Sequence, residues 1–223
     1  MRPHNHPDTS TLVAYAAGAV NEAFSLVLAA HMESCDKCRA AVSQAEAVGG
    51  GFMEDLPAAE MAHEGMSHIW ERIAAAPAVQ PVSPSPKHNS GVPAVLSPYL
   101  PDGLQDVHWQ TLVPGIRQHL LESVNSGQGS IRFLCIAPGT PIPHHTHLGS
   151  ELTLVLQGSF SDETGYYRPG DLADVDSTVH HSPVVDSEDP CICLVATDQR
   201  LRFTGTLNRM LQPFLEIGRA SCR

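Results

Sequence analysis

The sequence has 223 residues, enough for one large or two small domains with a buried core. It carries 13 Lys and Arg against 24 Asp and Glu, a formal net charge of −11, which argues against DNA or RNA as a direct partner because phosphate binding needs a basic face. No apolar run approaches the roughly 20 residues that a membrane helix requires, and the N-terminus lacks a secretory core, so we expect a cytoplasmic protein without a membrane partner.

Residues 1–75 have the pattern of a small helical unit. Asp8 or Thr9 is the predicted N-cap of a first helix, and Asn21 caps a second helix over 22–32. A third, Ala-rich helix follows Cys38 and is expected to end at about Val48, because three glycines come next.

A fourth helix is predicted to start at Pro57. Its apolar residues recur at helical spacing and would form one stripe: Met61, Met66, Ile69, Trp70 and Ile73. Such a stripe is usually core. Four short helices bury little area by themselves, however, so part of the stripe is expected to serve a partner.

A first metal site is predicted where the second helix meets the third. His31 lies four residues before Cys35, and Cys35 lies three residues before Cys38, so two thiolates and an imidazole can share one cation. A closed zinc site needs a fourth ligand. We favour His6, which adjoins the start of the first helix, over its competitor His4. A redox-active C-x2-C pair is the alternative, but the strand and βαβ context that it requires are absent.

A linker is predicted over residues 76–93, which are rich in Pro and Ser. Residues 94–217 then alternate short apolar strands with Gly and Pro turns, as in a barrel or sandwich. The predicted strands cover 107–110, 116–121, 130–136, 151–156, 159–162, 171–175, 191–196 and 200–203.

A second metal site is predicted in this β region. His145 and His147 alternate on an extended segment and therefore share one face, and Glu151 follows them after a turn. Two imidazoles and a carboxylate suit zinc, iron, manganese or nickel. A fourth ligand is expected further along the chain, where His180 and His181 are adjacent.

The spacing Gly-x5-His-x-His-x3-Glu-x6-Gly, followed by Pro169-Gly170-Asp171 and a histidine ten residues after that Asp, resembles the two-part metal signature of cupin barrels. The resemblance implies a jelly-roll barrel. Its implied metal ligands are His145, His147, Glu151 and His181, with His180 as the one ambiguity.

The His-x3-Cys-x2-Cys segment with its upstream histidine resembles a zinc-binding anti-sigma domain. With the cupin half, the whole chain resembles an anti-sigma factor of the ChrR type. The segments that carry this likeness, besides the ligands, are 14–18, 22–26, 152–158 and 191–193. Residues 218–223 have no counterpart and are expected to be a disordered end.

The resemblance implies a multi-domain α + β protein, with a four-helix zinc-binding anti-sigma domain before a cupin β-barrel. It implies structural zinc held by His6, His31, Cys35 and Cys38, and a second divalent metal, preferably zinc, in the barrel. One extracytoplasmic-function sigma factor per chain would be bound and inhibited by the helices. The cupin would be needed to release it in response to singlet oxygen or oxidative stress, without enzymatic activity.

Two alternatives concern the barrel. Cupins with three His and one Glu include metal-dependent dioxygenases, although no general acid or base stands out beyond the ligands. A cupin that binds a small molecule without chemistry would also fit. Cys191 and Cys193 are expected to be small buried apolar residues, the alternative being an oxidation-sensitive pair.

Overall fold

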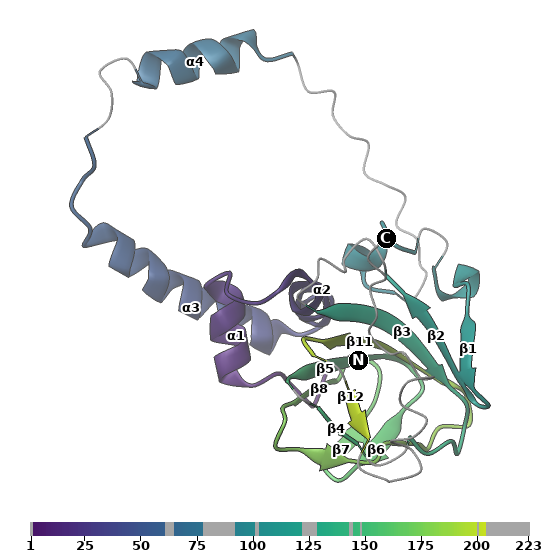
Figure 1. Ribbon diagram of the computed structural model, residues 1–223. Helices are drawn as coiled ribbons and strands as arrows, with labels where there is room; N and C mark the ends of the chain where they lie inside the picture. Colours follow the sequence, from purple (N-terminus) through teal and green to yellow (C-terminus); the bar gives the residue numbers. More distant parts are fainter. Residues whose placement is uncertain are drawn as a thin grey trace.

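The computed structural model describes residues 2–60, 65–77, 92–100, 103–121, 129–142, 145–147, 149–199 and 201–203. Most of the predicted linker and the C-terminal end, residues 218–223, lie outside these ranges. Figure 1 shows the helices and strands, whose bounds are α1 Thr9–Ala16, α2 Glu22–Met32, α3 Asp36–Glu54, α4 Gly65–Ala75, η1 Ala94–Leu96, η2 Gly103–Asp106, β1 Gln110–Val113, β2 Ile116–Leu120, β3 Ser130–Ile136, β4 His145–His147, β5 Glu151–Gln157, β6 Phe160–Asp162, β7 Gly165–Tyr167, β8 Leu172–Val175, β9 His180–His181, β10 Val184–Val185, β11 Cys191–Thr197 and β12 Leu201–Phe203.

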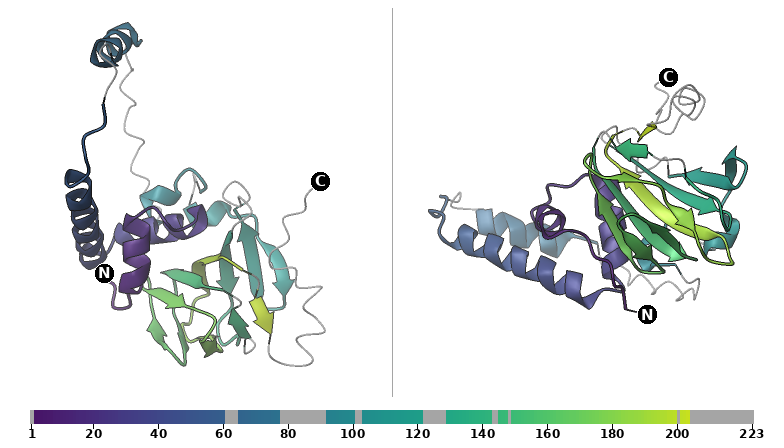
Figure 2. Two further views of the ribbon diagram at one scale, coloured as in Figure 1. Left: turned by 60° about the vertical axis from the view of Figure 1, so that its left-hand side comes forward. Right: turned by 90° about the horizontal axis from the view of Figure 1, so that it is seen from below.

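The strands form three antiparallel sheets that curve around a common interior (Figure 2). The largest sheet has the order β1-β2-β3-β11-β5-β8, and the two smaller sheets have the orders β10-β6-β7 and β12-β4-β9. The predicted α + β architecture, with helices first and an antiparallel barrel after them, is confirmed. Among the residues described, no helix is long and apolar enough to cross a membrane.

Helix α2 covers the outer face of the largest sheet. Its buried apolar side chains pack with those of the sheet in one hydrophobic core. Asn21 caps this helix as predicted, its side chain accepting a hydrogen bond from the backbone N of Phe24 at 2.9 Å. Val27 and Leu28 of α2 are fully buried. Their core includes outward-facing residues of β3, β5, β8 and β11, namely Ile131, Phe133, Leu152, Leu154, Leu172, Leu194 and Ala196.

The inner face of the same sheet lines the barrel. Residues that are directly opposite in register share a face, so the alternation along each strand separates inside from outside. The apolar part of the barrel interior consists of Ile116, Ile136, Val155, Phe160, Tyr167, Ala173, Val185, Cys191, Cys193 and Val195.

The prediction that Gly49–Gly51 end the third helix is wrong, since α3 continues to Glu54. None of these three glycines adopts the positive φ of a helix-ending residue, and nothing lies within 4 Å of the position that a Cβ would occupy. Each glycine lowers helix propensity by about 1 kcal/mol relative to Ala, but it ends a helix only when the backbone takes a left-handed turn.

Two predicted starts are also wrong. Residues 57–60 are not helical, and the described part of α4 begins at Gly65, because a proline permits a helix start without imposing one. The strand predicted over 107–110 instead runs from Gln110 to Val113. Its pairing with β2 is set by the turn at Pro114 and Gly115, where Gly115 has a φ of 85°.

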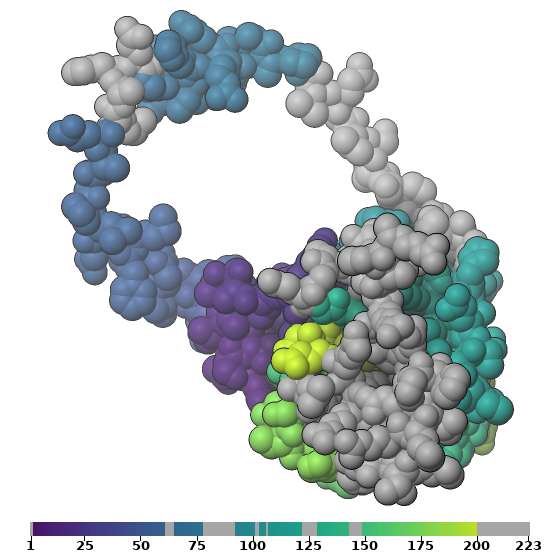
Figure 3. All heavy atoms as spheres, in the orientation of Figure 1, coloured from purple at the N-terminus to yellow at the C-terminus, as the bar shows by residue number. Residues whose placement is uncertain are grey.

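The distal part of α3 and all of α4 stand away from the barrel (Figures 1 and 3). Their apolar side chains are exposed, with Trp70 showing 63% of its surface and Phe52 showing 71%. The described members of the predicted apolar stripe therefore do not form a core. Met61, its first member, lies outside the described residues.

The shared core predicts that truncating a buried side chain of α2 destabilises the barrel as well. Leu28→Ala should lower the free energy of unfolding by about 2–5 kcal/mol, because it leaves a cavity between helix and sheet. Denaturant unfolding is monitored by the fluorescence of Trp109 in the barrel and by the circular dichroism of the helices. The two transition midpoints should shift together in this variant. The control Val48→Ala removes an exposed side chain and should change stability by less than about 0.5 kcal/mol. An unchanged barrel transition in Leu28→Ala would contradict the shared core.

Candidate metal centres

Four side chains from the N-terminal segment, α2 and α3 converge on one point. The candidate ligand atoms of His6, His31, Cys35 and Cys38 all lie within 4.8 Å of one another. Cys35 Sγ is 3.3 Å and Cys38 Sγ is 3.5 Å from His6 Nδ1, and His31 Nε2 is 3.3 Å from Cys38 Sγ. Tetrahedral bonds of about 2.0–2.3 Å to zinc would separate the ligand atoms by roughly 3.3–3.8 Å. The donor set and its spacing fit zinc.

Local structure explains how the two cysteines meet. Cys35 is the N-cap of α3, and its sulfur accepts a hydrogen bond from the backbone N of Cys38 at 3.4 Å. The cap therefore directs Cys35 back toward the first turn, where Cys38 lies. His31 is in the last turn of α2 and is fully buried.

The barrel fixes the orientation of His31. Its Nδ1 lies 2.9 Å from the backbone carbonyl of Gly170, in the turn between β7 and β8. Because a carbonyl can only accept, Nδ1 must donate, which leaves the lone pair of Nε2 for a metal. The carbonyl of Gly170, 139 residues further along the chain, therefore determines which ring nitrogen of His31 is available as a ligand.

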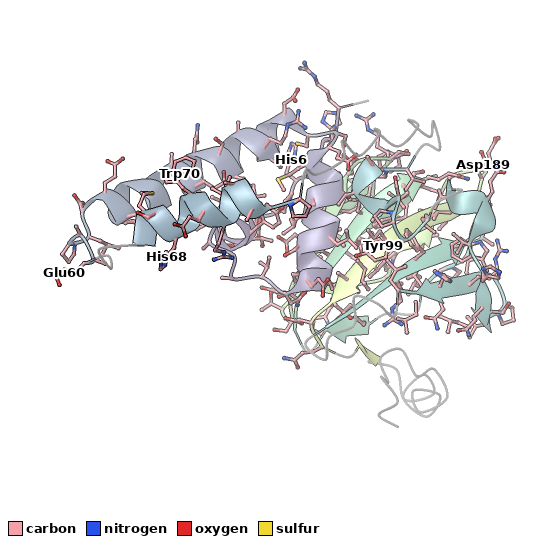
Figure 4. All side chains as sticks on the ribbon, turned by 90° about the horizontal axis from the view of Figure 1, so that it is seen from above. His6, Glu60, His68, Trp70, Tyr99 and Asp189 are labelled. Carbon is pink, nitrogen blue, oxygen red and sulfur yellow. The ribbon has the colours of Figure 1, made fainter. Side chains whose placement is uncertain are left out.

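The barrel also holds the segment that carries His6. The buried carboxylate of Asp171 accepts hydrogen bonds from the backbone N of His4 and from that of Asn5, the latter at 3.0 Å. The backbone N of Leu172 returns a bond to the carbonyl of Asn5 at 3.3 Å. His6, rather than its predicted competitor His4, is the histidine brought to the cysteines (Figure 4).

The protonation equilibria of this cluster favour neutral groups. Burial lowers the pKa of His31 and of His6, so both imidazoles are neutral at pH 7. Burial, together with the hydrogen bond to Cys35, raises the pKa of Cys38 to about 12. The Cys38 thiol therefore becomes a thiolate at neutral pH only when a cation balances its charge, as zinc would.

The second predicted site is described in part. Backbone pairing sets His145 opposite His181, and His147 follows at the alternate position of the same strand. The side chains of His145 and His147, and all of His144, lie outside the described residues. Glu151 and His181 are buried, whereas His180 is exposed and points to the opposite face by strand alternation. This difference favours His181 over His180 as the ligand.

An interaction that the sequence did not reveal orients His181. Its Nδ1 lies 2.8 Å from a carboxylate oxygen of Asp162 on β6. Burial alone would lower the pKa of His181, but the Asp162 hydrogen bond and the nearby charge of Glu151 raise it overall. Asp162 could not be identified from the sequence, because it lies 19 residues before His181, too far for a local spacing pattern. It supplies the carboxylate that commonly supports a metal-binding histidine.

The remaining cysteine pair lies inside the barrel. Cys191 and Cys193 are buried on the inner face of β11, with their sulfurs 3.5 Å apart. Both pack within the apolar cluster of the interior, which agrees with their predicted role as small buried apolar residues.

Comparison with known proteins matches both parts of the chain. The family model of the ChrR cupin-like domain matches residues 103–200. The sequence is 39% identical over 217 residues to the anti-sigma-E factor ChrR of Cereibacter sphaeroides, covering 97% of this chain and 100% of that protein. The structure is similar to one chain in the crystal structure of Rhodobacter sphaeroides SigE in complex with the anti-sigma ChrR. The TM-score is 0.73 at 38% identity, and the match covers 87% of this chain and 99% of that chain.

The contacts to the barrel turn predict that Asp171 supports the helical zinc site without being a ligand. Asp171→Asn should weaken zinc binding by about 10–100-fold, because an amide oxygen holds the His4 and Asn5 backbone less firmly than a carboxylate. Competition of the purified full-length protein against a chromophoric chelator measures this affinity. Asp186→Asn, a carboxylate of the barrel far along the chain, is the control and should leave it unchanged.

The ligand assignment predicts two independent losses of metal. Cys38→Ala should remove the metal of the helical site, and His181→Ala should remove the metal of the barrel. Metal analysis of purified Cys38→Ala and of purified His181→Ala should each show one equivalent less than the parent. The control Cys135→Ala, which changes a buried cysteine outside both sites, should contain as much metal as the parent. Equal metal content in the parent and in Cys38→Ala would contradict the helical site.

Proposed function

We propose, from the premise that this chain belongs to the family of ChrR anti-sigma factors, that it binds and inhibits an extracytoplasmic-function sigma factor through its N-terminal helices. Membership of this family makes the chain a regulatory protein rather than an enzyme. The observation that carries the proposal is the exposed apolar surface of α3 and α4. Exposing this surface to water does not stabilise the free chain. A partner that covered it would remove the apolar area from water and so stabilise the complex.

This surface, here called the α3–α4 surface, comprises the exposed large apolar side chains of α3, of the residues that directly follow it, and of α4. They are 45–72% exposed and consist of Val48, Phe52, Met53, Leu56, Met66, Ile69, Trp70 and Ile73. The surface includes an aromatic residue of the kind that dominates interface energies, Trp70 (Figure 4). In this proposal the sigma factor lies between the two helices and is bound by both, with its polymerase-binding surface covered.

The helical zinc would hold the base of this clamp. Cys35 and Cys38 open α3, and His31 closes α2, so zinc would fix the angle between these helices. The metal would contribute charge to stabilise two thiolates and a rigid crosslink. The residues themselves set the direction in which α3 leaves the barrel. Loss of the metal would free α3 and weaken the hold on the partner.

We further propose that the cupin barrel controls release of the sigma factor in response to singlet oxygen or related oxidative stress. Its support is the connection between the two candidate metal centres. Gly170 contacts His31 of the helical centre, and Asp171 holds the backbone that leads to His6. Strand β8, which begins at the next residue, pairs Val175 with Glu151 of the barrel centre. A change at the barrel centre would therefore reach His31 through one short strand.

The proposed interface predicts that Trp70→Ala weakens sigma binding by about 30-fold or more, the loss of about 2 kcal/mol that is typical of a buried aromatic anchor. Trp70 is exposed in the free chain, so its loss should not disturb folding. Titration calorimetry with the co-purifying sigma factor measures the affinity. Tyr166→Ala, which removes a 55% exposed aromatic side chain from the barrel, is the matched control. Equal affinities for the two variants would refute the assignment of the interface.

The proposed control by the barrel predicts that inhibition and response separate. Glu151→Gln should leave transcription inhibited in the dark and should abolish the induction caused by a photosensitiser in light. A reporter gene that depends on the sigma factor reads both states in the native cell. Constitutive reporter activity in Glu151→Gln would show that the barrel is needed for inhibition itself. A normal light response would remove the barrel centre from the mechanism.

A further inference from the structure

The interior of the barrel has a polar end that neither metal centre nor sigma binding explains. The inner face of the largest sheet is apolar over most of its area. At one end, however, six polar side chains from β2, β3, β5 and β11 share that face by register: Gln118, Ser130, Arg132, Glu151, Thr153 and Thr197. Only Glu151 among them is a predicted metal ligand.

Arg132 is the centre of this polar group. Its exposed fraction is 3%, and its guanidinium donates to Gln118 Oε1 at 3.1 Å and to Ser130 Oγ at 2.7 Å. Ser130 Oγ is in turn 3.0 Å from Thr197 Oγ1. The Nε of Arg132 is buried and has no hydrogen-bond partner among the described residues, and no described carboxylate lies within ion-pair distance of the side chain.

Among the described residues no carboxylate forms an ion pair with this buried guanidinium, and Glu151 acts on it only through its nearby charge. Burial lowers the pKa of Arg132 to about 10, with Glu151 opposing that effect, so the side chain stays charged at neutral pH. Its contacts are to a neutral amide and a neutral hydroxyl, which satisfy hydrogens without balancing the charge. Buried charges in proteins are normally paired, because removing an unpaired charge from water is strongly unfavourable.

The geometry points to a binding site for a small organic carboxylate in the barrel, anchored by Arg132. A guanidinium offers its Nε and a neighbouring Nη in one plane, which matches the two oxygens of a carboxylate. Glu151 faces the same space, so a monoanion is accommodated better than a doubly charged phosphate. Val195, directly opposite Arg132 in register, belongs to the apolar cluster and offers a surface for a hydrocarbon chain.

This inference goes beyond sigma-factor binding and does not depend on it. The test therefore reads ligand binding by the full-length, metal-loaded protein alone. Sodium butyrate is the probe, sodium sulfate tests a doubly charged anion at matched ionic strength, and the neutral methyl butyrate tests the apolar chain without the charge. Proton–nitrogen correlation spectra of the arginine Nε groups report directly on the unpartnered atom.

Butyrate should shift one arginine Nε resonance saturably, and the resonance should be the one missing from Arg132→Lys. That variant keeps the charge but loses the planar fork, so its affinity for butyrate should fall about tenfold or more. Arg117→Lys is the control, since Arg117 lies on the same sheet but faces outward, over the ring of Trp109 at 5.6 Å. It should bind butyrate like the parent. The ester should leave the spectrum unchanged.

Absence of a saturable shift in the parent overturns the proposal, and this measurement needs no variant to fold. Tighter binding of sulfate than of butyrate overturns the assignment to carboxylates. Equal weakening in Arg117→Lys and Arg132→Lys overturns the location. Arg132→Met adds a thermal test, in which butyrate should raise the melting temperature of the parent and leave that of the variant unchanged. A rise of equal size in both proteins contradicts the role of Arg132.

Discussion

The hydrogen bond between His31 and the carbonyl of Gly170 is the interaction on which the arrangement of this protein depends. It joins His31, a candidate ligand of the helical metal centre, to a turn of the barrel, and it selects the ring nitrogen that faces the cysteines. Asp171, the next residue, holds the backbone that leads to His6. Two of the four candidate ligands are thus oriented by a single turn, so the helical cluster is complete only when the barrel is folded beside it.

This dependence changes how the two halves of the chain are best understood. The sequence suggests a helical unit and a barrel joined by a linker, each with its own metal. In the structure, α2 is at once the middle of the helical half and the cover of the largest sheet. Among the described helices, the distal part of α3 and α4 stand apart from the barrel, and most of the exposed large apolar side chains lie on or next to them. The helical half is therefore itself divided into a part that packs on the barrel, which includes α2, and a part with an exposed apolar surface, which includes α4.

Much of this could be predicted from residue spacing, and the failures share a cause. Cys35 and Cys38 belong to one helix start, and His31 precedes them by a turn, so local geometry brings them together without knowledge of the fold. Strand alternation places His180 and His181 on opposite faces, but it is their burial in the structure that shows His181 to be the inward one. Asp162 and Gly170 could not be found in this way, because they reach their histidines only through the pairing of distant strands. The predicted helix end at Gly49–Gly51 was wrong because glycine permits the left-handed conformation that ends a helix but does not impose it, and none of the three adopts it.

The exposed surface of α3 and α4 also affects how the cell must produce this protein. Apolar side chains left open to water adhere to whatever apolar surface they meet, including those of other copies of the same chain. A surplus of the protein over its partner would then tend to aggregate, and synthesis in step with the partner would protect it. The exposed apolar surface thus favours synthesis of this protein in amounts matched to those of the partner proposed to cover it.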